Sequence, residues 1–217
     1  MVKIILMMVF FVLSLSTVLF GGEKASVSIS FEECKEDKVP EGFKSSKSGK
    51  GPEGEWVIVE DETAPSPRKV LAQTSDEDLE YHFPILIYEG INLSDGLVKV
   101  SFKAISGRRD RAAGILFRFQ DPDNYYVLRA NALEDNLDLF RFEKGKRKKI
   151  NGADIKVSSR EWHTIKVEFR GNSIQGYYDD KLLIDVKDDT YKTGKVGLWT
   201  KADSVTYFDD LIVESLE

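Results

Sequence analysis

The chain has 217 residues, of which 41% are hydrophobic and 31% charged, and its formal net charge is −6. This charge argues against nucleic-acid partners, because proteins that bind phosphate backbones need a basic surface to displace counterions. The length suits one domain with a sizeable core, and all-β sandwiches of this size commonly form a single domain.

Residues 1–22 have the pattern of a secretory signal peptide. Lys3 precedes an apolar run from Ile4 to Phe20, and the small residues Gly21 and Gly22 follow it. The run is at the short end of the roughly 20 residues that span a bilayer. We therefore expect export to the periplasm or the cell exterior. An uncleaved N-terminal membrane anchor is the alternative.

Residues 23–55 are predicted to form an irregular N-terminal segment of the mature chain. They are polar, with a stretch rich in glycine, lysine and serine at residues 44–54. Cys34 is the only cysteine, so no intrachain disulfide can form and the fold must depend on its core. Because the first strand pattern begins at Trp56, we place the β-sandwich domain at residues 56–217.

The rest of the chain is a succession of short strands. Apolar and polar residues alternate with a period of two, as in half-buried strands, and Gly, Asn, Asp and Pro separate the segments. No segment has a long helical period, and there is no tandem repeat. Many short strands with frequent turns predict an all-β sandwich or barrel. The main predicted strands are 56–59, 70–74, 98–104, 113–119, 125–131, 137–143, 163–170, 173–179, 182–186, 195–199 and 208–214.

Two segments give the chain a family resemblance. Residues 111–126 read RAAGILFRFQDPDNYY and continue through residues 129–136, and residues 197–210 read GLWTKADSVTYFDD. With these segments, residues 56–214 resemble the concanavalin A-like lectin/glucanase superfamily. The nearest likeness is to the laminin-G-like jelly rolls of the bacterial 3-keto-disaccharide hydrolase type. The resemblance implies a two-sheet antiparallel jelly-roll β-sandwich with one concave sheet. It leaves function open, because the superfamily includes lectins, glycosidases and adhesion modules.

One motif of that superfamily is missing from the sequence. Its retaining glucanases carry Glu-x-Asp-x-x-Glu on a strand, which brings two carboxyl groups close enough for a retaining mechanism. This chain has no Glu-x-Asp, and the acidic stretch at residues 134–138 has a different spacing. The sequence therefore favours a non-catalytic protein. If it is an enzyme, the acid and base would come from carboxylates such as Glu134, Asp135, Glu168 and Asp185.

Strand alternation predicts a ligand-binding patch on the hairpin of residues 113–131. With Phe117 and Phe119 in the core, Arg118 should point away from it. If that face is the concave one, Arg118, Arg129 and Asn131 would hydrogen-bond sugar hydroxyls, and Tyr125 and Trp199 would stack on sugar rings. The alternative is an exposed sheet face with ordinary cross-strand pairs. The predicted ligand-binding residues are Arg118, Tyr125, Arg129, Asn131 and Trp199.

Oxygen-bearing side chains suggest a structural calcium ion as a second kind of site. Asp135 and Asn136 follow Glu134 in one loop, and Asp209 lies near the C-terminus. Calcium needs six to eight oxygen ligands, but no fixed calcium-loop spacing is present. The alternative is capping and turn formation by these side chains. The weak metal candidates are Asp135, Asn136 and Asp209.

No other cofactor is indicated. His82 and His163 are the only histidines, and neither a zinc motif nor a glycine-rich phosphate loop is present. Residues 144–149 (KGKRKK) form a basic hairpin tip, expected to be a solvated turn or a contact for an anionic glycan.

These observations favour an exported, non-catalytic carbohydrate-binding module whose partner is a polysaccharide or oligosaccharide bound on the concave sheet. A glycoside hydrolase-like enzyme is one alternative. A laminin-G-like adhesion or structural domain with a protein partner is another.

Overall fold

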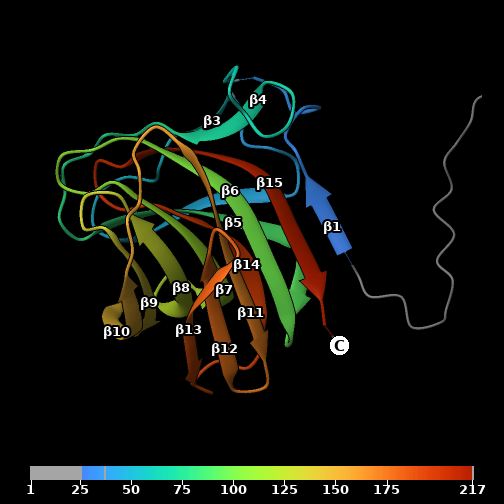
Figure 1. The fold of residues 1–217 in the computed structure, drawn as a ribbon, viewed down its shortest axis with the longest axis vertical. Coiled ribbons are helices and arrows are strands. Elements are labelled where there is room, and N and C mark those ends of the chain that lie inside the picture. The colour runs from blue at the N-terminus through green and yellow to red at the C-terminus, as the bar shows by residue number, and fades with distance from the viewer. Residues whose placement is uncertain (1–25, 37, 217) are drawn as a thin grey trace, which may run out of the picture.

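The computed structural model describes residues 26–36 and 38–216. This part of the chain folds into two antiparallel sheets that pack face to face (Figure 1). The eight-stranded sheet has the order β13 (Lys181–Lys187), β12 (Ser173–Tyr178), β11 (Trp162–Arg170), β6 (Gly96–Ser106), β15 (Val205–Ser215), β4 (Lys69–Gln73) and β3 (Trp56–Glu60), with β1 (Ser26–Ile29) paired to β15. The seven-stranded sheet has the order β10 (Lys146–Asp154), β9 (Asn136–Glu143), β8 (Asn124–Asn131), β7 (Ala112–Asp121), β14 (Gly194–Trp199), β5 (His82–Leu93) and β2 (Phe43–Gly49).

The predicted all-β, two-sheet antiparallel sandwich is confirmed. The predicted signal peptide, residues 1–22, lies outside the described residues. Within residues 26–36 and 38–216, no helix is long and apolar enough to cross a membrane.

The prediction that residues 23–55 are irregular is wrong for two stretches. β1 extends the eight-stranded sheet, and β2 pairs along β5 from Phe43 opposite Tyr88 to Gly49 opposite His82. The sequence of β2, FKSSKSG, has no apolar alternation, because it is an edge strand with mostly half-exposed side chains. The folded unit therefore begins well before Trp56.

The core lies between the sheets and follows the alternation of the strands. Val98, Val100 and Phe102 of β6 point inward from one sheet, and Ile115 and Phe117 of β7 point inward from the other. All five side chains are fully buried. Removing such apolar surface from water contributes roughly 25 cal/mol per Å², which is the main term that holds a disulfide-free sandwich together.

The alternation of β7 breaks after Phe117. The register with β8 shifts between Phe117 and Asp121, and Arg118 adopts a φ of +47°, the left-handed region that non-glycine residues rarely enter. This bulge turns Phe119 to the opposite face of the sheet, where it packs apart from the inter-sheet core. The expectation that Phe117 and Phe119 share a face is therefore wrong.

The same bulge buries Arg118, against the prediction that it points outward. Its guanidinium lies 5.1 Å from the ring centroid of Phe169 on the facing sheet. It donates to the carbonyl oxygens of Ser94 at 2.8 Å, Gly171 at 2.8 Å and Tyr191 at 2.9 Å. Arg118 is fully buried and ties three loops together, so it has no surface to offer a ligand.

Candidate functional site

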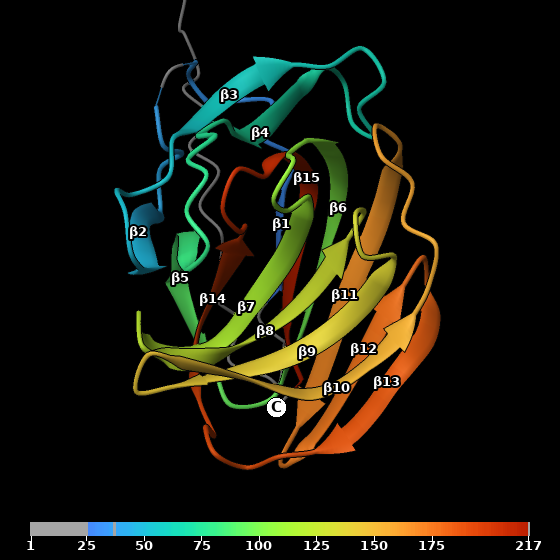
Figure 2. The ribbon, with the colours of Figure 1, turned by 90° about the vertical axis from the view of Figure 1, so that its left-hand side faces the viewer.

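The candidate site lies on the outer face of the seven-stranded sheet, the side turned away from the eight-stranded sheet. Figure 2 shows β7, β8, β9 and β10 running side by side on this part of the molecule. One part of the outer face is apolar and the other is polar. We call the apolar part the outer aromatic cluster; its aromatic members are Phe83, Phe119, Tyr125, Phe140, Phe142 and Trp199.

Tyr125 and Trp199 are interior members of the outer aromatic cluster. Trp199 stacks on Phe83 at 5.4 Å between ring centroids, and Tyr125 stacks on Phe142 at 4.4 Å. The Tyr125 hydroxyl donates to Ser48 Oγ at 2.9 Å, and burial raises the pKa of Tyr125. Both rings are fully buried, so the expectation that they present open faces for stacking on a sugar is wrong.

The polar part of the outer face is centred on a single row across the sheet. Trp199, Gly114, Arg129, Asp138 and Gly152 lie opposite one another on β14, β7, β8, β9 and β10. Gly152 makes room for the Asp138 carboxylate, and Gly114 makes room for the Trp199 ring. A Cβ on Gly152 would overlap the Asp138 carboxylate, and one on Gly114 would lie 3.1 Å from the Trp199 ring.

Arg129 is the centre of a buried hydrogen-bond network. Its Nη2 donates to Glu134 Oε2 at 2.9 Å, Asn136 Oδ1 at 2.6 Å and Asp138 Oδ2 at 3.0 Å. Lys149 of β10 reaches the other oxygen of Asp138 at 2.6 Å. Arg129 and Asp138 are buried, whereas the side chains of Glu134 and Lys149 are 45% and 53% exposed. Fixed interior groups therefore hold charged groups at the surface.

A second group joins this network from the loops at one end of the sheet. Asn131 donates to Asp110 Oδ1 at 2.8 Å, and Lys201 forms an ion pair with Asp110 Oδ2. Arg147 lies close to this set, because its guanidinium and that of Arg129 both lie over the Phe140 ring. We call the combined set the polar cluster: Asp110, Arg129, Asn131, Glu134, Asn136, Asp138, Arg147, Lys149 and Lys201. Its members come from β8, β9, β10 and the segments that follow β6, β8 and β14.

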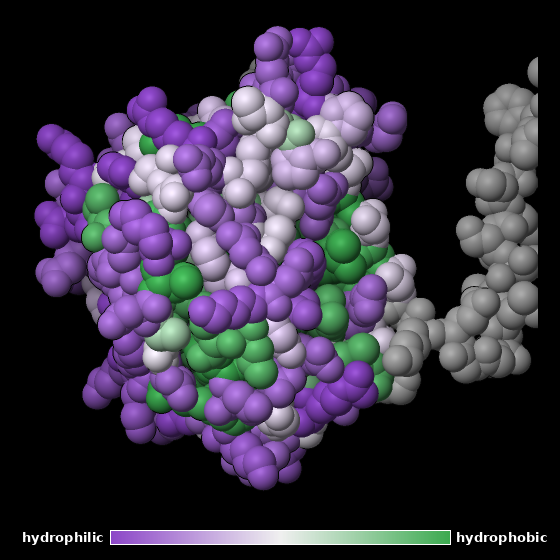
Figure 3. Space-filling model, viewed as in Figure 1, coloured by the Kyte–Doolittle hydropathy of each residue, from purple (hydrophilic) through white to green (hydrophobic). Residues whose placement is uncertain are grey.

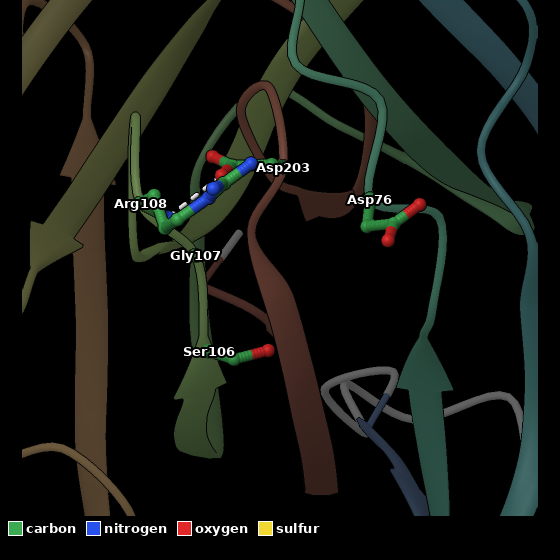
Figure 4. Close-up of a pocket in the computed structure, with 5 residues that line it drawn as sticks. All are labelled: Asp76, Ser106, Gly107, Arg108 and Asp203. Carbon is green, nitrogen blue, oxygen red and sulfur yellow. Dashed lines mark hydrogen bonds between the residues drawn. The ribbon is translucent and has the colours of Figure 1, made fainter.

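Asp203 fixes the loop that carries Asp110. Its carboxylate accepts the backbone N–H groups of Arg108 at 2.6 Å, Arg109 at 3.1 Å and Asp110 at 3.0 Å. Burial opposes ionisation of Asp203, but these amide hydrogen bonds outweigh it and lower its pKa. Figure 4 shows Asp203 and Arg108 on one side of a shallow pocket of about 170 Å³ and Asp76 on the other.

The charges of the polar cluster perturb one another. Burial opposes ionisation of Glu134, but the adjacent Arg129 guanidinium prevails and lowers its pKa. Burial raises the pKa of Asp110, and Lys201 only partly offsets this. Arg147 has a lowered pKa, first because of burial and then because of Arg129. The cluster thus contains an ionised surface carboxylate, Glu134, that can accept hydrogen bonds.

The structure places two of the five predicted ligand-binding residues, Arg129 and Asn131, in the polar cluster. Tyr125 and Trp199 meet each other instead inside the outer aromatic cluster, where Trp199 Nε1 donates to the Tyr125 hydroxyl at 3.3 Å. Sequence reasoning missed Asp110, Asp138 and Lys201 as partners of Arg129 and Asn131. Alternation could have placed Asp138 beside Arg129, because Asn136, Asp138 and Phe140 share one face of β9. The contribution of Asp110 depends on loop geometry that periodicity does not describe.

The metal candidates lie apart and have other partners. Asp135 binds Lys156 and the backbone N–H of Val157, and Asn136 binds Arg129. Asp209 accepts from Ser66 on the other sheet. In residues 26–36 and 38–216, no group of three or more His, Cys, Asp and Glu side chains is arranged to hold a metal ion.

The carboxylates named for the enzyme alternative are also separated. Glu168 on β11 and Asp185 on β13 belong to the eight-stranded sheet, where they bind Arg170 and Gln175. Glu134 binds Arg129, and its neighbour Asp135 binds Lys156. Glu134 therefore sits on a different sheet from Glu168 and Asp185.

Comparison with known protein families shows to which family the chain belongs. Residues 31–214 match the model of the 3-keto-alpha-glucoside-1,2-lyase-like domain. The chain belongs to this family. The match begins at Phe31, so the 3-keto-alpha-glucoside-1,2-lyase-like domain includes β2, which we had predicted to lie outside the sandwich.

Individual relatives of this 3-keto-alpha-glucoside-1,2-lyase-like domain are associated with carbohydrates. The chain is 27% identical to levanase of Bacillus subtilis (strain 168) over 149 residues, which are 67% of this chain and 19% of levanase. It therefore spans about a fifth of that curated relative.

Two solved structures share the fold. Carbohydrate binding module CBM66 from Bacillus subtilis has a TM-score of 0.64 and 22% identity, covering 80% of this chain and 96% of the module. Domain 4 of AbnA, an extracellular arabinanase from Geobacillus stearothermophilus solved with arabinotriose, has a TM-score of 0.57 and 10% identity over 89% and 93% of the two chains. These likenesses confirm the concanavalin A-like jelly roll that the sequence resemblance implied.

Proposed function

We propose that this domain is an exported, non-catalytic carbohydrate-binding module and that the polar cluster is its glycan site. The observation that carries the proposal is that some polar atoms around Arg129 are bound within the protein, whereas others remain available to a ligand. Glu134 Oε2 is occupied by Arg129 and Asn136, whereas Oε1 has no hydrogen-bond donor among the described residues. The neighbouring Lys149 ammonium forms an ion pair with Asp138 Oδ1, and its N–H donors can serve other acceptors.

This arrangement suits sugar hydroxyls, each of which donates one hydrogen bond and accepts others. Free acceptors and donors that are held in place by buried partners lose little side-chain entropy when a ligand binds. Because the aromatic rings of the outer face are buried, we expect polar contacts to dominate recognition. The names of CBM66, levanase and the arabinotriose complex support an oligosaccharide ligand.

Export is part of the proposal. The signal-like residues 1–22 motivate it, and the extracellular arabinanase is a relative in fold that acts outside the cell. A module that binds polysaccharide needs to meet its ligand there.

Titration calorimetry with a panel of oligosaccharides, including arabinotriose and fructan fragments, tests the site. Glu134→Gln keeps the size of the side chain but removes its charge, and we expect it to weaken binding by about tenfold, the size of one charge-assisted hydrogen bond. Glu168→Gln is the matched control, because Glu168 also pairs with an arginine but lies on the other sheet. Equal affinity of Glu134→Gln and wild type would place the ligand elsewhere.

A catalytic role is the second candidate, because the family takes its name from a lyase-like activity. Incubation with a 3-keto-disaccharide separates the two functions. Product formation that Glu134→Gln abolishes would favour the enzyme over the binding module.

An adhesion role would need a protein-binding face. Figure 3 shows some apolar surface among the polar side chains of the face in view. On the eight-stranded sheet, Leu182 of β13 is 45% exposed. A protein partner captured through Leu182, together with no binding of any sugar, would favour this third function.

A further inference from the structure

We propose that the ligand of the polar cluster carries a carboxylate, as uronic acid sugars do, and that Arg147 is the residue that binds it. The inference depends on the proposed function, because it names the class of sugar that the same site takes.

The side-chain donors of Arg147 have no acceptor among the residues that the structure describes. Arg147 lies on β10 opposite Phe142, and its charged group stacks between two rings, 4.7 Å from the centroid of Phe140 and 5.4 Å from that of Phe83. Its Nη1 is buried and makes no hydrogen bond, and the side chain forms no ion pair within residues 26–36 and 38–216. The residue as a whole is half-buried, so part of it still reaches solvent.

The other guanidinium groups that the fold buries are treated differently. Arg118 donates to three backbone carbonyls, Arg129 to three side-chain oxygens, and Arg141 to Asp188 and Thr190. Arg129 and Arg141 each also have a buried Nε without a hydrogen bond, but of these four arginines only Arg147 has no acceptor for its side chain at all among the described residues. Buried polar groups in native proteins are nearly always hydrogen-bonded, and a specific exception needs an explanation. Stacking on Phe140 and Phe83 stabilises the charge of Arg147 but leaves its N–H donors unused.

Charge balance points the same way. The polar cluster has three carboxylates, on Asp110, Glu134 and Asp138, and each is paired with Arg129, Lys149 or Lys201. Arg147 is the fourth cation and has no carboxylate of its own. The cluster therefore has an excess positive charge on a chain whose net charge is −6. An anionic ligand would neutralise this excess, whereas a neutral sugar would leave it.

The geometry of the charge favours a carboxylate. A guanidinium is planar and presents its N–H donors as a fork that matches the two oxygens of a carboxylate. The Phe140 and Phe83 rings hold this fork in place. The Arg129 guanidinium also lies over Phe140, 5.2 Å from its centroid, so the fork shares this ring with the network that holds Glu134. Lys146 and Lys148 alternate with Arg147 along β10 and line a separate open pocket with Glu143 and Lys144. They are not part of this site.

Calorimetry with matched acidic and neutral ligands tests the inference. The probes are short oligomers of galacturonic, glucuronic and mannuronic acid, each compared with its methyl ester, which removes the charge and keeps the sugar. We expect at least one acid to bind about tenfold more tightly than its ester, and the difference to shrink as salt is raised. A sulfated oligosaccharide of the same length shows whether any anion suffices.

Variants assign the effect to Arg147. Arg147→Met is expected to bind acid and ester with equal affinity, and Arg147→Lys to recover only part of the preference, because lysine keeps the charge but not the fork. Lys148→Met is the control, since it makes the same charge change on the same strand but on the opposite face. Thermal melting of each variant confirms that it is folded.

The outcomes separate the two proposals. Acid and ester binding equally to wild type overturns the carboxylate inference and leaves the carbohydrate-binding function intact. Tighter binding of the sulfated sugar than of every uronate also overturns it. If neither the uronates, nor the esters, nor any neutral sugar of the panel binds, the proposed function itself fails.

Discussion

Arg118 and Arg129 lie on neighbouring strands of one sheet, yet their guanidinium groups lie on opposite faces of that sheet and have different roles. The left-handed φ of +47° at Arg118 sends its side chain to the inter-sheet core, where backbone carbonyls accept hydrogen bonds from all three guanidinium nitrogens. Arg129 follows regular alternation to the outer face, where its acceptors are side chains and one of them, Glu134, also reaches solvent. One of the two arginines is therefore structural, and the other organises the candidate site.

Removing the Arg118 guanidinium should destabilise the fold. Arg118→Met leaves the carbonyl oxygens of Ser94, Gly171 and Tyr191 without their donor, and we expect the free energy of unfolding to fall by about 2–4 kcal/mol. Arg170→Met, which removes an exposed arginine, should cost less than about 1 kcal/mol. Urea unfolding measures both. Equal losses for the two variants would contradict a structural role for Arg118.

Among the elements, the 107–110 loop depends on one carboxylate. Asp203 accepts three successive backbone amides and thereby sets the position of Asp110, which reaches Asn131 and Lys201. Three hydrogen bonds to one charge explain why the pKa of Asp203 is lowered despite burial.

The Asp203 interaction predicts a pH dependence of stability. Because its pKa is lower in the folded state than the unfolded value of about 3.9, its contribution is complete above that pH and is lost as pH falls through the folded pKa. Asp203→Asn should reduce the free energy of unfolding by about 1–3 kcal/mol near neutral pH, and this deficit should shrink below about pH 4. Urea unfolding between pH 2 and 7 measures it. Asp76→Asn, across the same pocket, is the control, and a deficit that does not change with pH would refute the assignment.

Strand positions were the most predictable elements. The segments predicted as strands at residues 98–104 and 137–143 lie within β6 and β9. They were predictable because half-buried strands have apolar residues at every second position. β2 has no such pattern, since an edge strand with half-exposed side chains does not need an apolar residue at every second position. The bulge at Arg118 could not be predicted from the sequence for another reason. The alternation argument assumes a regular strand backbone, and one residue in the left-handed region reverses the predicted faces of all residues that follow it in β7.

The candidate site was predictable only in part. Arg129 and Asn131 follow from alternation on β8, and their strand neighbours could have been paired with them by register. The burial of Tyr125 and Trp199 could not be foreseen, because it requires a second apolar cluster on a face that we expected to be open. Whether an aromatic residue is a platform or a core residue depends on what covers it, and here Ser48 and Arg147 lie over the cluster.

At the scale of the whole molecule, the two faces of the seven-stranded sheet divide structure from proposed function. The inner face supplies the core, and the outer face combines the outer aromatic cluster with the polar cluster. The aromatic cluster makes the second face rigid, and a rigid face holds the charged groups in position without help from a ligand.

The family relationship gives this arrangement a context. The chain spans 19% of levanase, and CBM66 is matched along 96% of its length. A sandwich of this kind therefore occurs both within a much larger protein and as a module solved by itself.

NMR mapping of amide chemical shifts during titration with the tightest-binding oligosaccharide tests directly whether the polar cluster is the glycan site. If it is, the shifts concentrate at residues 129–138 and 147–152, around the polar cluster on the outer face of the seven-stranded sheet. Shifts confined to β11, β12 and β13 of the eight-stranded sheet, with the polar cluster unchanged, would contradict this assignment.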